Sequence, residues 1–388
     1  MLNVHYISPS TFPSKAANSV HVIHQVFALS KLNLKIHLYG AKNIPKSNKE
    51  IKSRLEKEYG VNLDDTRLNL IPVLIKRGIN LQIAIFSIVK LALLSFSSSN
   101  KIYSRNLYAA FFFNSILRRK IVFETHQIEQ GINGVFQKHI LSSKKAKVVL
   151  ITKKLHIILE EYYSIKITNP FILSDAAPEG LNPFNNKQKE NTLLRLGIRK
   201  NNFLYICGYF GHLYQGRGIE IIISMAKRSP KVLYLIFGGN DEDIARLTHQ
   251  TNDKNIQLMG HVDNVLAREV MMSIDCLLMP YQKKVSIGQK GHDTARWMSP
   301  MKMFEYMASS NPIISSNLPA LREVLKDGEN AILVECDNVD QWIDALNSLI
   351  NNKDLANRIA LNAYKEYTEK YNWLYRAKKI HQIMEDNF

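Results

Sequence analysis

Residues 203–227, FLYICGYFGHLYQGRGIEIIISMAK, contain in succession an apolar run, a turn with three glycines and a second apolar segment. The run 203–207 has the character of a buried strand, and 219–227 predicts the helix that follows it. Glycines let the intervening turn, Gly211 to Gly218, bend tightly and bring its backbone close to a ligand. A strand, a glycine turn and a helix in this order are typical of a parallel α/β sheet.

The same alternation extends to both sides of this stretch. Downstream strand candidates are 232–237, 256–259, 276–279, 312–315 and 331–334, and two amphipathic helices follow at 338–350 and from 354 to the C-terminus. Upstream, strands are expected at 3–8, 34–39, 102–103, 120–123 and 148–151, with helices at 20–31, at 49–59 and up to residue 163. Between the two series, 169–200 is rich in proline and polar residues, which indicates a linker or a peripheral excursion. A chain of 388 residues with two such series is expected to form two domains.

The positive charge is placed unevenly along the chain. Residues 1–170 hold 25 Lys and Arg against 9 Asp and Glu, a balance of 25 − 9 = +16, and the rest hold 26 against 25, or +1. A basic first half favours an anionic partner such as lipid headgroups, nucleic acid or a polyanionic acceptor, although general solubility also explains such a charge. The three cysteines lie far apart beside apolar residues, and residues 1–7 read as a strand rather than a secretory signal. We therefore expect a cytoplasmic protein.

Residues 79–96 are apolar over 18 positions, with five polar interruptions. That length is at the edge of a transmembrane span. Asn80, Ser87, Lys90 and Ser95 gather on one narrow helical stripe, which favours a helix packed on a sheet or a helix at a membrane interface over a spanning helix. The three alternatives remain open from the sequence.

The segment SPMKMFEYMA, residues 299–308, predicts a helix that begins at an anion site. Ser299 is a suitable N-cap and Pro300 suits the first helical position, so the N–H groups that follow are free to bind an anion. Glu305 lies one turn in, where a carboxylate would repel a phosphate but could accept hydrogen bonds from neutral hydroxyls. An ordinary capped helix explains the same pattern.

Three further segments carry polar groups at expected strand ends. Arg217, in the glycine turn, offers a bidentate fork for phosphate oxygens. His126 closes a strand in the first half, where ligands of open α/β sheets bind. The loop 13–21 brings Asn18 and Ser19 to the start of a helix. Each segment alone is explained equally well by a solvated arginine, a structural histidine or a capped helix.

Taken in order, these segments resemble family 4 of the retaining glycosyltransferases, which have the GT-B fold. The matching pieces are the loop with Asn18 and Ser19, then 123–126, 211–218, 259–262, 275–281 and 299–316. The resemblance implies an α/β protein of two Rossmann-like parallel-sheet domains that face each other across a cleft. Residues 1–172 would be the acceptor domain, 173–370 the nucleotide-sugar domain, and 371–388 a helix that crosses back to the first domain.

The resemblance also implies roles for single residues. Arg217 matches the contact to the donor diphosphate, Glu305 the carboxylate that binds the ribose, and His126 a histidine near the reacting sugar; these three would be catalytic. The rest of the donor diphosphate and sugar site would be Gly211, His212, Ser299, Pro300, Met301, Lys302 and Met303. The base would lie at Gly260, His261 and Val262, and the acceptor side would hold Asn18, Ser19 and Glu124. The chain departs from the family at Trp297, where a second glutamate is usual and which Asp293 or His292 could replace.

The activity implied is transfer of a sugar from a nucleoside-diphosphate sugar to an acceptor hydroxyl with retention of configuration. Arg217 and the helix N–H groups would stabilise the charge on the departing diphosphate without a metal, and no cofactor is expected. The acceptor would be lipid-linked or a glycan in cell-surface glycan or glycolipid assembly, and the basic first domain would contact the inner face of an anionic membrane. No nucleic acid partner is expected. The alternatives are a nucleotide-sugar epimerase on the same fold and a basic membrane- or polyanion-binding module without catalysis.

Overall fold

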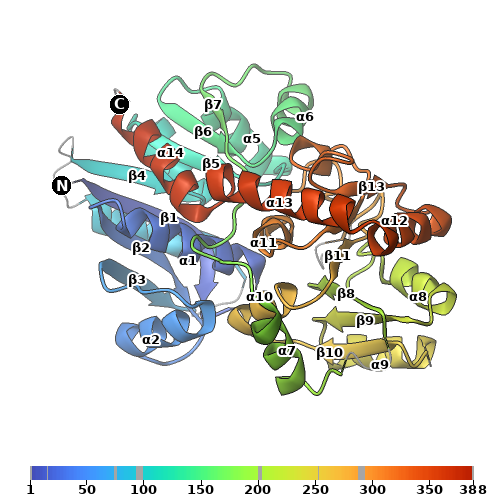
Figure 1. Cartoon of the computed structure of the whole chain (residues 1–388). Helices are drawn as coiled ribbons and strands as arrows, with labels where there is room; N and C mark the ends of the chain where they lie inside the picture. The colour runs from blue at the N-terminus through green and yellow to red at the C-terminus, as the bar shows by residue number, and fades with distance from the viewer. Residues whose placement is uncertain are drawn as a thin grey trace. The chain divides into compact units, whose positions relative to one another are not determined.

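The computed structural model describes residues 2–14, 16–73, 77–92, 99–199, 203–251, 253–286 and 293–386. The chain divides into two compact units, the first formed by residues 1–175 and 373–388 and the second by residues 176–372. These limits differ by a few residues from the boundaries expected at 172/173 and 370/371. The C-terminal segment returns to the first unit, where α14 (Trp373–Glu385) packs on α1 (Ala17–Ser30), as the red and blue helices of Figure 1 show.

Unit 1 is a seven-stranded parallel sheet with the order β3-β2-β1-β4-β5-β6-β7. Its strands are β1 (Asn3–Phe12), β2 (Lys35–Lys42), β3 (Thr66–Pro72), β4 (Asn100–Ser104), β5 (Ile121–Thr125), β6 (Ala146–Leu150) and β7 (Pro170–Ile172). In register, Asn3 of the central β1 pairs with Lys35 on one side and Asn100 on the other. The other helices of the unit are α2 (Asn48–Tyr59), α3 (Ile79–Ala92), α4 (Leu107–Phe111), the π-helix η1 (Phe112–Ile116), α5 (Gly131–Leu141) and α6 (Lys153–Tyr163).

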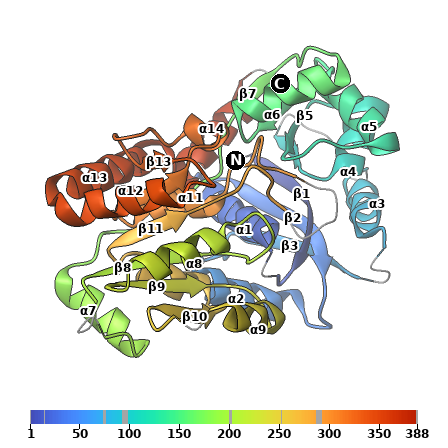
Figure 2. The same ribbon diagram turned by 90° about the vertical axis from the view of Figure 1, so that its right-hand side faces the viewer.

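Unit 2 is a six-stranded parallel sheet with the order β10-β9-β8-β11-β12-β13. Its strands are β8 (Tyr205–Phe210), β9 (Val232–Phe237), β10 (Ile256–Gly260), β11 (Cys276–Met279), β12 (Ile313–Ser316) and β13 (Ile332–Val334). Its helices are α7 (Asn186–Arg195), α8 (Ile219–Arg228), α9 (Asp241–Gln250), α10 (Asn264–Met271), α11 (Met301–Ala308), α12 (Val339–Asn351) and α13 (Lys353–Lys370), with the short 3₁₀ helix η3 (Leu321–Glu323). The expected fold class, two Rossmann-like parallel-sheet domains, is confirmed (Figure 2).

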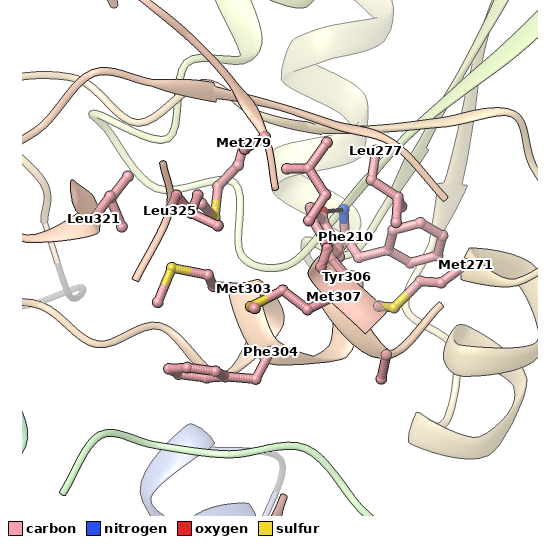
Figure 3. Close-up of a cluster of buried hydrophobic side chains, with 14 of the residues drawn as sticks. Phe210, Met271, Leu277, Met279, Met303, Phe304, Tyr306, Met307, Leu321 and Leu325 are labelled. Carbon is pink, nitrogen blue, oxygen red and sulfur yellow. Dashed lines mark hydrogen bonds between the residues drawn. The ribbon is translucent and has the colours of Figure 1, made fainter. Parts of the chain in front are cut away.

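The core of unit 2 holds α11 in place. Met303, Phe304, Tyr306 and Met307 point from α11 into a cluster of apolar side chains, drawn in Figure 3. Burying each such side chain contributes about 1.5–3 kcal/mol. The hydroxyl of Tyr306 also accepts a hydrogen bond of 2.9 Å from the backbone N–H of Phe210, the last residue of β8. The start of α11 is therefore fixed relative to the carboxyl end of β8.

Each strand order reverses direction once, at β1 and β4 in unit 1 and at β8 and β11 in unit 2. Helices leave the sheet on opposite faces at such a reversal, so a crevice opens beyond the carboxyl ends of the strands, where ligands of open α/β sheets bind. Asn18 and Ser19 follow β1 and the glycine turn follows β8, whereas His126 follows β5 and His261 follows β10.

The structure corrects three local expectations. The segment expected as a linker contains β7 and α7, and α7 forms because Asn185 and Gln188 make a reciprocal capping box. The last helix is broken at 371–372, between α13 and α14. In α3, Ser87 is fully buried and its hydroxyl bonds to the Ala84 carbonyl, so the polar stripe does not mark the solvent side. A search of the described residues for membrane-spanning helices finds none, and residues 93–96 of the expected apolar helix lie outside the described residues.

Candidate functional site

The glycine turn after β8 packs directly on the segment that follows β11. A Cβ atom on Gly216 would lie 1.9 Å from the carbonyl oxygen of Lys284, and one on Gly218 would lie 1.8 Å from that of Pro280. Both glycines also have positive φ, 84° and 76°. Only glycine allows this close approach, so the sequence fixes the position of Arg217 between them.

Arg217 and Lys302 meet at one tyrosine. The Arg217 guanidinium and the Lys302 ammonium each lie 5.1 Å from the centre of the Tyr281 ring, and Arg217 donates to the Tyr281 hydroxyl at 2.9 Å. Arg217 also donates to the Ser286 carbonyl at 3.1 Å, and Lys302 lies 3.9 Å above the ring of Tyr209. Aromatic faces and neutral oxygens thus hold two cations side by side without an anion between them.

These cations keep donors unused. The Lys302 Nζ and the Arg217 Nε are buried, and neither has a hydrogen-bond partner among the described residues. Burial and the neighbouring Arg217 hold the pKa of Lys302 well below its usual range, against the smaller opposing effect of Glu305. Two partly buried basic side chains whose buried nitrogens have no partner are costly unless an anion joins them, so the arrangement is suited to an anionic ligand.

The first turn of α11 supplies further hydrogen-bond donors. Its N-cap residue differs from the expected Ser299. The helix begins at Met301, and Pro300 stands at the N-cap with an extended ψ of 125° and no side-chain cap. Ser299, expected as the cap, is buried one residue earlier. The N–H of Met303 donates to the Pro300 carbonyl at 2.9 Å, and its side chain lies in the core. The N–H groups of Met301 and Lys302 are the ones that helix geometry leaves for a ligand.

Glu305 lies one turn further along α11 and is paired. Its carboxylate is 3.6 Å from the Arg268 guanidinium of α10. Burial raises the pKa of Glu305, and the charge of Arg268 opposes that shift. The side chain keeps about 20% of its surface exposed, so a neutral hydroxyl can still reach it.

The remaining donor-side candidates lie at neighbouring strand ends of the same sheet. His212 stacks on Tyr214 at 4.8 Å between ring centres, and burial together with Arg217 and Lys302 lowers its pKa. Gly260 closes β10, and its carbonyl accepts from Gly238 at 2.7 Å. His261 and Val262 follow directly, with His261 exposed and Val262 packed against the core.

In unit 1, His126 follows β5 and has both ring nitrogens bonded. Its Nε2 is 2.6 Å from Oε1 of Glu124, and its Nδ1 is 3.1 Å from the Arg105 guanidinium. Because a guanidinium can only donate, Nδ1 accepts and the ring proton sits on Nε2. Burial and Arg105 lower the pKa of His126 to about 4. The imidazole is therefore neutral at neutral pH.

Glu124 lies underneath His126 and has no exposed side-chain surface. Its carboxylate is 3.0 Å from both the His21 Nε2 and the Arg376 guanidinium, and it accepts a hydrogen bond from the Tyr103 hydroxyl. Burial alone would raise the pKa of Glu124, but Arg376 and His21 outweigh it and hold the pKa well below its usual range. A fully enclosed carboxylate cannot touch an acceptor, so Glu124 orients His126 instead of binding substrate as expected.

The same network joins α1 to residues 174–175 and α14, which lie at the two ends of the chain segments that form unit 1. His21 Nδ1 lies 2.7 Å from Asp175, and Arg376 donates to the Ser174 carbonyl at 2.9 Å. Ligand atoms of His21, His126 and Asp175 lie within 4.8 Å of one another, a spacing that a metal ion could use. The guanidinium groups beside them balance the carboxylates, so the cluster lacks the excess negative charge that favours a cation.

Three other residues expected in the site bond to nearby groups of the protein. The Asn18 amide donates to the Ser10 hydroxyl at 2.8 Å and keeps a buried Oδ1 without a partner among the described residues, whereas the buried Ser19 hydroxyl donates to the Thr11 carbonyl at 3.3 Å at the end of β1. Asp293 accepts from the backbone N–H groups of Val285 and Ala295, at 2.9 and 3.0 Å, and orders this loop. His292 lies outside the described residues.

Sequence reasoning missed several residues of the site. Tyr209, Tyr281 and Arg268 on the donor side, and Arg105 and Arg376 beside Glu124, were not singled out. The available signal was an arginine in an apolar helical stretch, as in VLAREVMM around Arg268 and WLYRAKKI around Arg376. A long charged side chain on the buried face of a helix requires a partner, and a buried carboxylate elsewhere in the chain is the usual one.

Comparisons with known proteins agree with the arrangement in unit 2. The family model described as glycosyl transferases group 1 matches residues 205–352. The phosphatidyl-myo-inositol mannosyltransferase of Mycolicibacterium smegmatis is 26% identical over 175 residues, which cover 44% of this chain and 42% of that protein. The enzyme of the same name from Mycobacterium leprae is 30% identical over 154 residues, 40% of this chain and 38% of the other. The chain thus spans less than half the length of the curated relatives it matches.

Solved structures match over nearly the whole chain. Anabaena Alr3699/HepE, crystallised with UDP, has a TM-score of 0.73 at 13% identity and covers 99% of both chains. A glycosyltransferase of Rickettsia africae has a TM-score of 0.73 at 14% identity and covers 100% of this chain and 99% of its own. At such identities the likeness establishes the fold alone, which is the GT-B fold.

Proposed function

We propose that this chain, whose residues 205–352 match the family model described as glycosyl transferases group 1, transfers a sugar from a nucleoside-diphosphate sugar to an acceptor hydroxyl. The observation that carries the proposal is a pair of basic side chains beside the first turn of α11, Arg217 and Lys302, whose buried Nε and Nζ have no hydrogen-bond partner among the described residues. A diphosphate supplies the missing negative charge and enough acceptor oxygens for both. The Anabaena neighbour, solved with UDP and with UDP-glucose, supports this ligand class.

The donor site extends from the diphosphate in two directions. Glu305, further along α11, accepts hydrogen bonds from the ribose hydroxyls, and the donor competes with Arg268 for that carboxylate. The base lies against Gly260, His261 and Val262 at the end of β10. Gly211 admits the phosphates closely, because a Cβ there would lie 2.6 Å from the Lys302 Nζ.

Catalysis follows from the charge that develops on the leaving group. Breaking the bond between the sugar and the diphosphate leaves negative charge on a phosphate oxygen, which Arg217, Lys302 and the free N–H groups of α11 stabilise without a metal. The sugar becomes oxocarbenium-like, and the acceptor attacks from the face that the diphosphate leaves, with the departing phosphate taking the acceptor proton. That path retains the anomeric configuration. The neutral His126, oriented by Glu124 through Nε2, binds a sugar hydroxyl at Nδ1 in place of the Arg105 guanidinium.

We further propose a lipid-linked or glycan acceptor in the assembly of cell-surface glycans or glycolipids, with the basic unit 1 in contact with an anionic membrane. Two observations support this part. Residues 1–170 carry a charge of +16, and the mycobacterial relatives are named as transferases to a phosphoinositide lipid. A peripheral contact of this kind needs no spanning helix.

The test is nucleotide binding followed by turnover. UDP, GDP, ADP and their sugars are screened by thermal shift, since a ligand at about 100 times its Kd adds roughly 2.7 kcal/mol of stability. One nucleotide should raise the melting temperature of the wild type, and the Arg217→Met variant should lose that shift. Arg228→Met is the matched control, because Arg228 pairs with Asp340 on the surface at the other end of α8.

The products then separate the alternatives. Release of nucleoside diphosphate that depends on an added acceptor supports the transferase. Formation of an isomeric nucleotide sugar without an acceptor would assign an epimerase. An unchanged melting temperature with every nucleotide, together with salt-sensitive binding to polyanions, would leave only a basic binding module.

A further inference from the structure

Unit 1 has an apolar surface that the proposed chemistry does not use. Leu81, Ile85 and Val89 follow one another at single-turn spacing along the outer side of α3, and each is 49–59% exposed. Ile116 of η1 and Ile132 and Val135 of α5 add three aliphatic side chains that are 58–67% exposed. These six residues are called the apolar face below. Figure 2 shows α3, α4 and α5 as neighbours in unit 1.

Four residues of the apolar face, Leu81, Ile85, Val89 and Ile116, line a hollow. A cavity of about 400 Å³ opens between α3, α4, η1 and α5. Its remaining lining is Ala84, Ile88, Tyr108, Phe111, Phe112 and Phe136. Phe111 and Phe136 stack at 4.3 Å between ring centres and form a rigid aromatic wall. A cavity of this size and lining accommodates a hydrocarbon chain and offers almost nothing to a polar ligand.

The charge around the apolar face has one sign. Residues 66–159 contain 15 Lys and Arg but only two acidic residues, Glu124 and Glu129, and Glu124 has no exposed surface. Arg118 and Lys120 follow η1 directly, and Lys138 lies on α5 one turn after Val135; all three are exposed. The apolar face is thus bordered by cations, with almost no carboxylates nearby. This combination complements a lipid surface, which presents anionic headgroups above a hydrocarbon layer.

We propose that the apolar face inserts into the hydrocarbon boundary of an anionic lipid bilayer, with an acyl chain in the cavity and the bordering cations on the lipid phosphates. The proposal deepens the membrane contact of the proposed function and rests on it. Charge attraction alone would give weak membrane binding that salt screens. Insertion adds the free energy of burying apolar surface, which salt does not screen.

The chain order places this surface beside the acceptor-side residues. α4 begins at Leu107, two residues after Arg105, and α5 begins at Gly131, five residues after His126. α5, and α4 with the η1 that continues it, therefore start at the carboxyl edge of the unit 1 sheet, where His126 lies. A lipid held there has its headgroup hydroxyls at the edge that holds the histidine.

The test uses the full chain and vesicles of phosphatidylcholine, with or without phosphatidylglycerol, in a sedimentation assay without nucleotide. The wild type should bind the anionic vesicles and keep part of that binding at high salt. The double variant Ile85→Ser, Val89→Ser removes two exposed aliphatic side chains, which should weaken binding tenfold or more. The matched control is Leu194→Ser, Leu361→Ser, because those leucines are exposed to a similar extent in unit 2.

Each outcome is decisive. Vesicle binding that the Ile85, Val89 variant retains in full, or binding that high salt abolishes completely, overturns insertion. A wild type that self-associates through this surface, with a mass in solution that the double variant reduces to that of one chain, assigns the surface to a second copy and overturns it as well. Nucleotide-induced thermal shifts of the same variants report separately on the donor site, so failure of the membrane proposal is distinguished from failure of the proposed function.

Discussion

Replacing Lys302 with methionine tests whether the unused donor of this lysine is kept for a ligand. Methionine is similar in length and flexible enough to keep the contacts with Tyr209 and Tyr281. In the unliganded protein the substitution removes a buried donor without a partner, whose presence costs about 1–3 kcal/mol. It also removes the cation–π attraction between the ammonium and the Tyr209 ring, 3.9 Å away, which contributes roughly 0.5–2 kcal/mol. The difference predicts a change in the stability of the unliganded protein between a loss of about 1 kcal/mol and a gain of about 2.5 kcal/mol.

Ligand binding should change in the opposite direction. A hydrogen bond between an ammonium and a phosphate oxygen contributes about 1.5–3 kcal/mol, so Lys302→Met should weaken nucleoside-diphosphate binding by roughly 10- to 150-fold. Urea denaturation of the unliganded protein gives the first quantity, and calorimetric titration with the nucleotide selected by thermal shift gives the second. Lys227→Met, at an exposed position near the end of α8, is the control and should change neither.

The lowered pKa of Lys302 predicts how protein stability and nucleotide binding depend on pH. Because its folded pKa lies well below the value of about 10.4 in an unfolded chain, the unfolded state holds more protons between those two values. Stability should therefore rise as pH increases through the folded pKa and level off above the unfolded one. A bound diphosphate favours the charged amine, so binding should take up a proton and weaken at higher pH. Titrations in buffers of different ionisation enthalpy measure that uptake, and Lys302→Met should abolish it.

Two results would refute the reasoning. If unliganded Lys302→Met loses more than about 1 kcal/mol, the lysine is an ordinary structural contributor. If the variant binds nucleotide as tightly as the wild type, the diphosphate does not lie at the Arg217 and Lys302 pair.

The remaining predictions concern the scaffold of the two sites. Glu124→Gln should destabilise unit 1 by about 3–5 kcal/mol in urea denaturation, because it leaves the Arg376 guanidinium buried without its counter-charge; a loss below 1 kcal/mol would show that the network is unimportant to the fold. Gly218→Ala should cost more than Gly180→Ala, although both glycines have similar positive φ angles, because only the Cβ at 218 meets the Pro280 carbonyl. Equal unfolding midpoints for the two alanine variants would contradict the close approach at Gly218.

The sequence predicted the elements well where an apolar run is bounded by glycine or by a polar cap. β8, β9 and α8 were predicted within one to three residues because their buried strands and helix carry a clear period and a glycine turn joins two of them. It failed where the local signal was polar, as in α7, which a capping box forms from a segment that reads as a linker. The start of α11 predicted from the sequence is one residue too early. Ser299 and Pro300 match the preferences of the N-cap and the first helical position, but Pro300 is the N-cap in the structure.

What the sequence alone determined is therefore local: the parallel α/β class, the position of Arg217 between two obligatory glycines, and the helix that carries Lys302 and Glu305. The tertiary structure decided which distant charges meet. Strand order brings β5 and the last helix together, so Glu124 pairs with Arg376, and the same packing turns Ser87 inward and leaves Leu81, Ile85 and Val89 at the surface. Backbone periodicity depends on neighbours in the chain, whereas burial and charge pairing depend on neighbours in space, and the order of the strands sets those only once the sheet has formed.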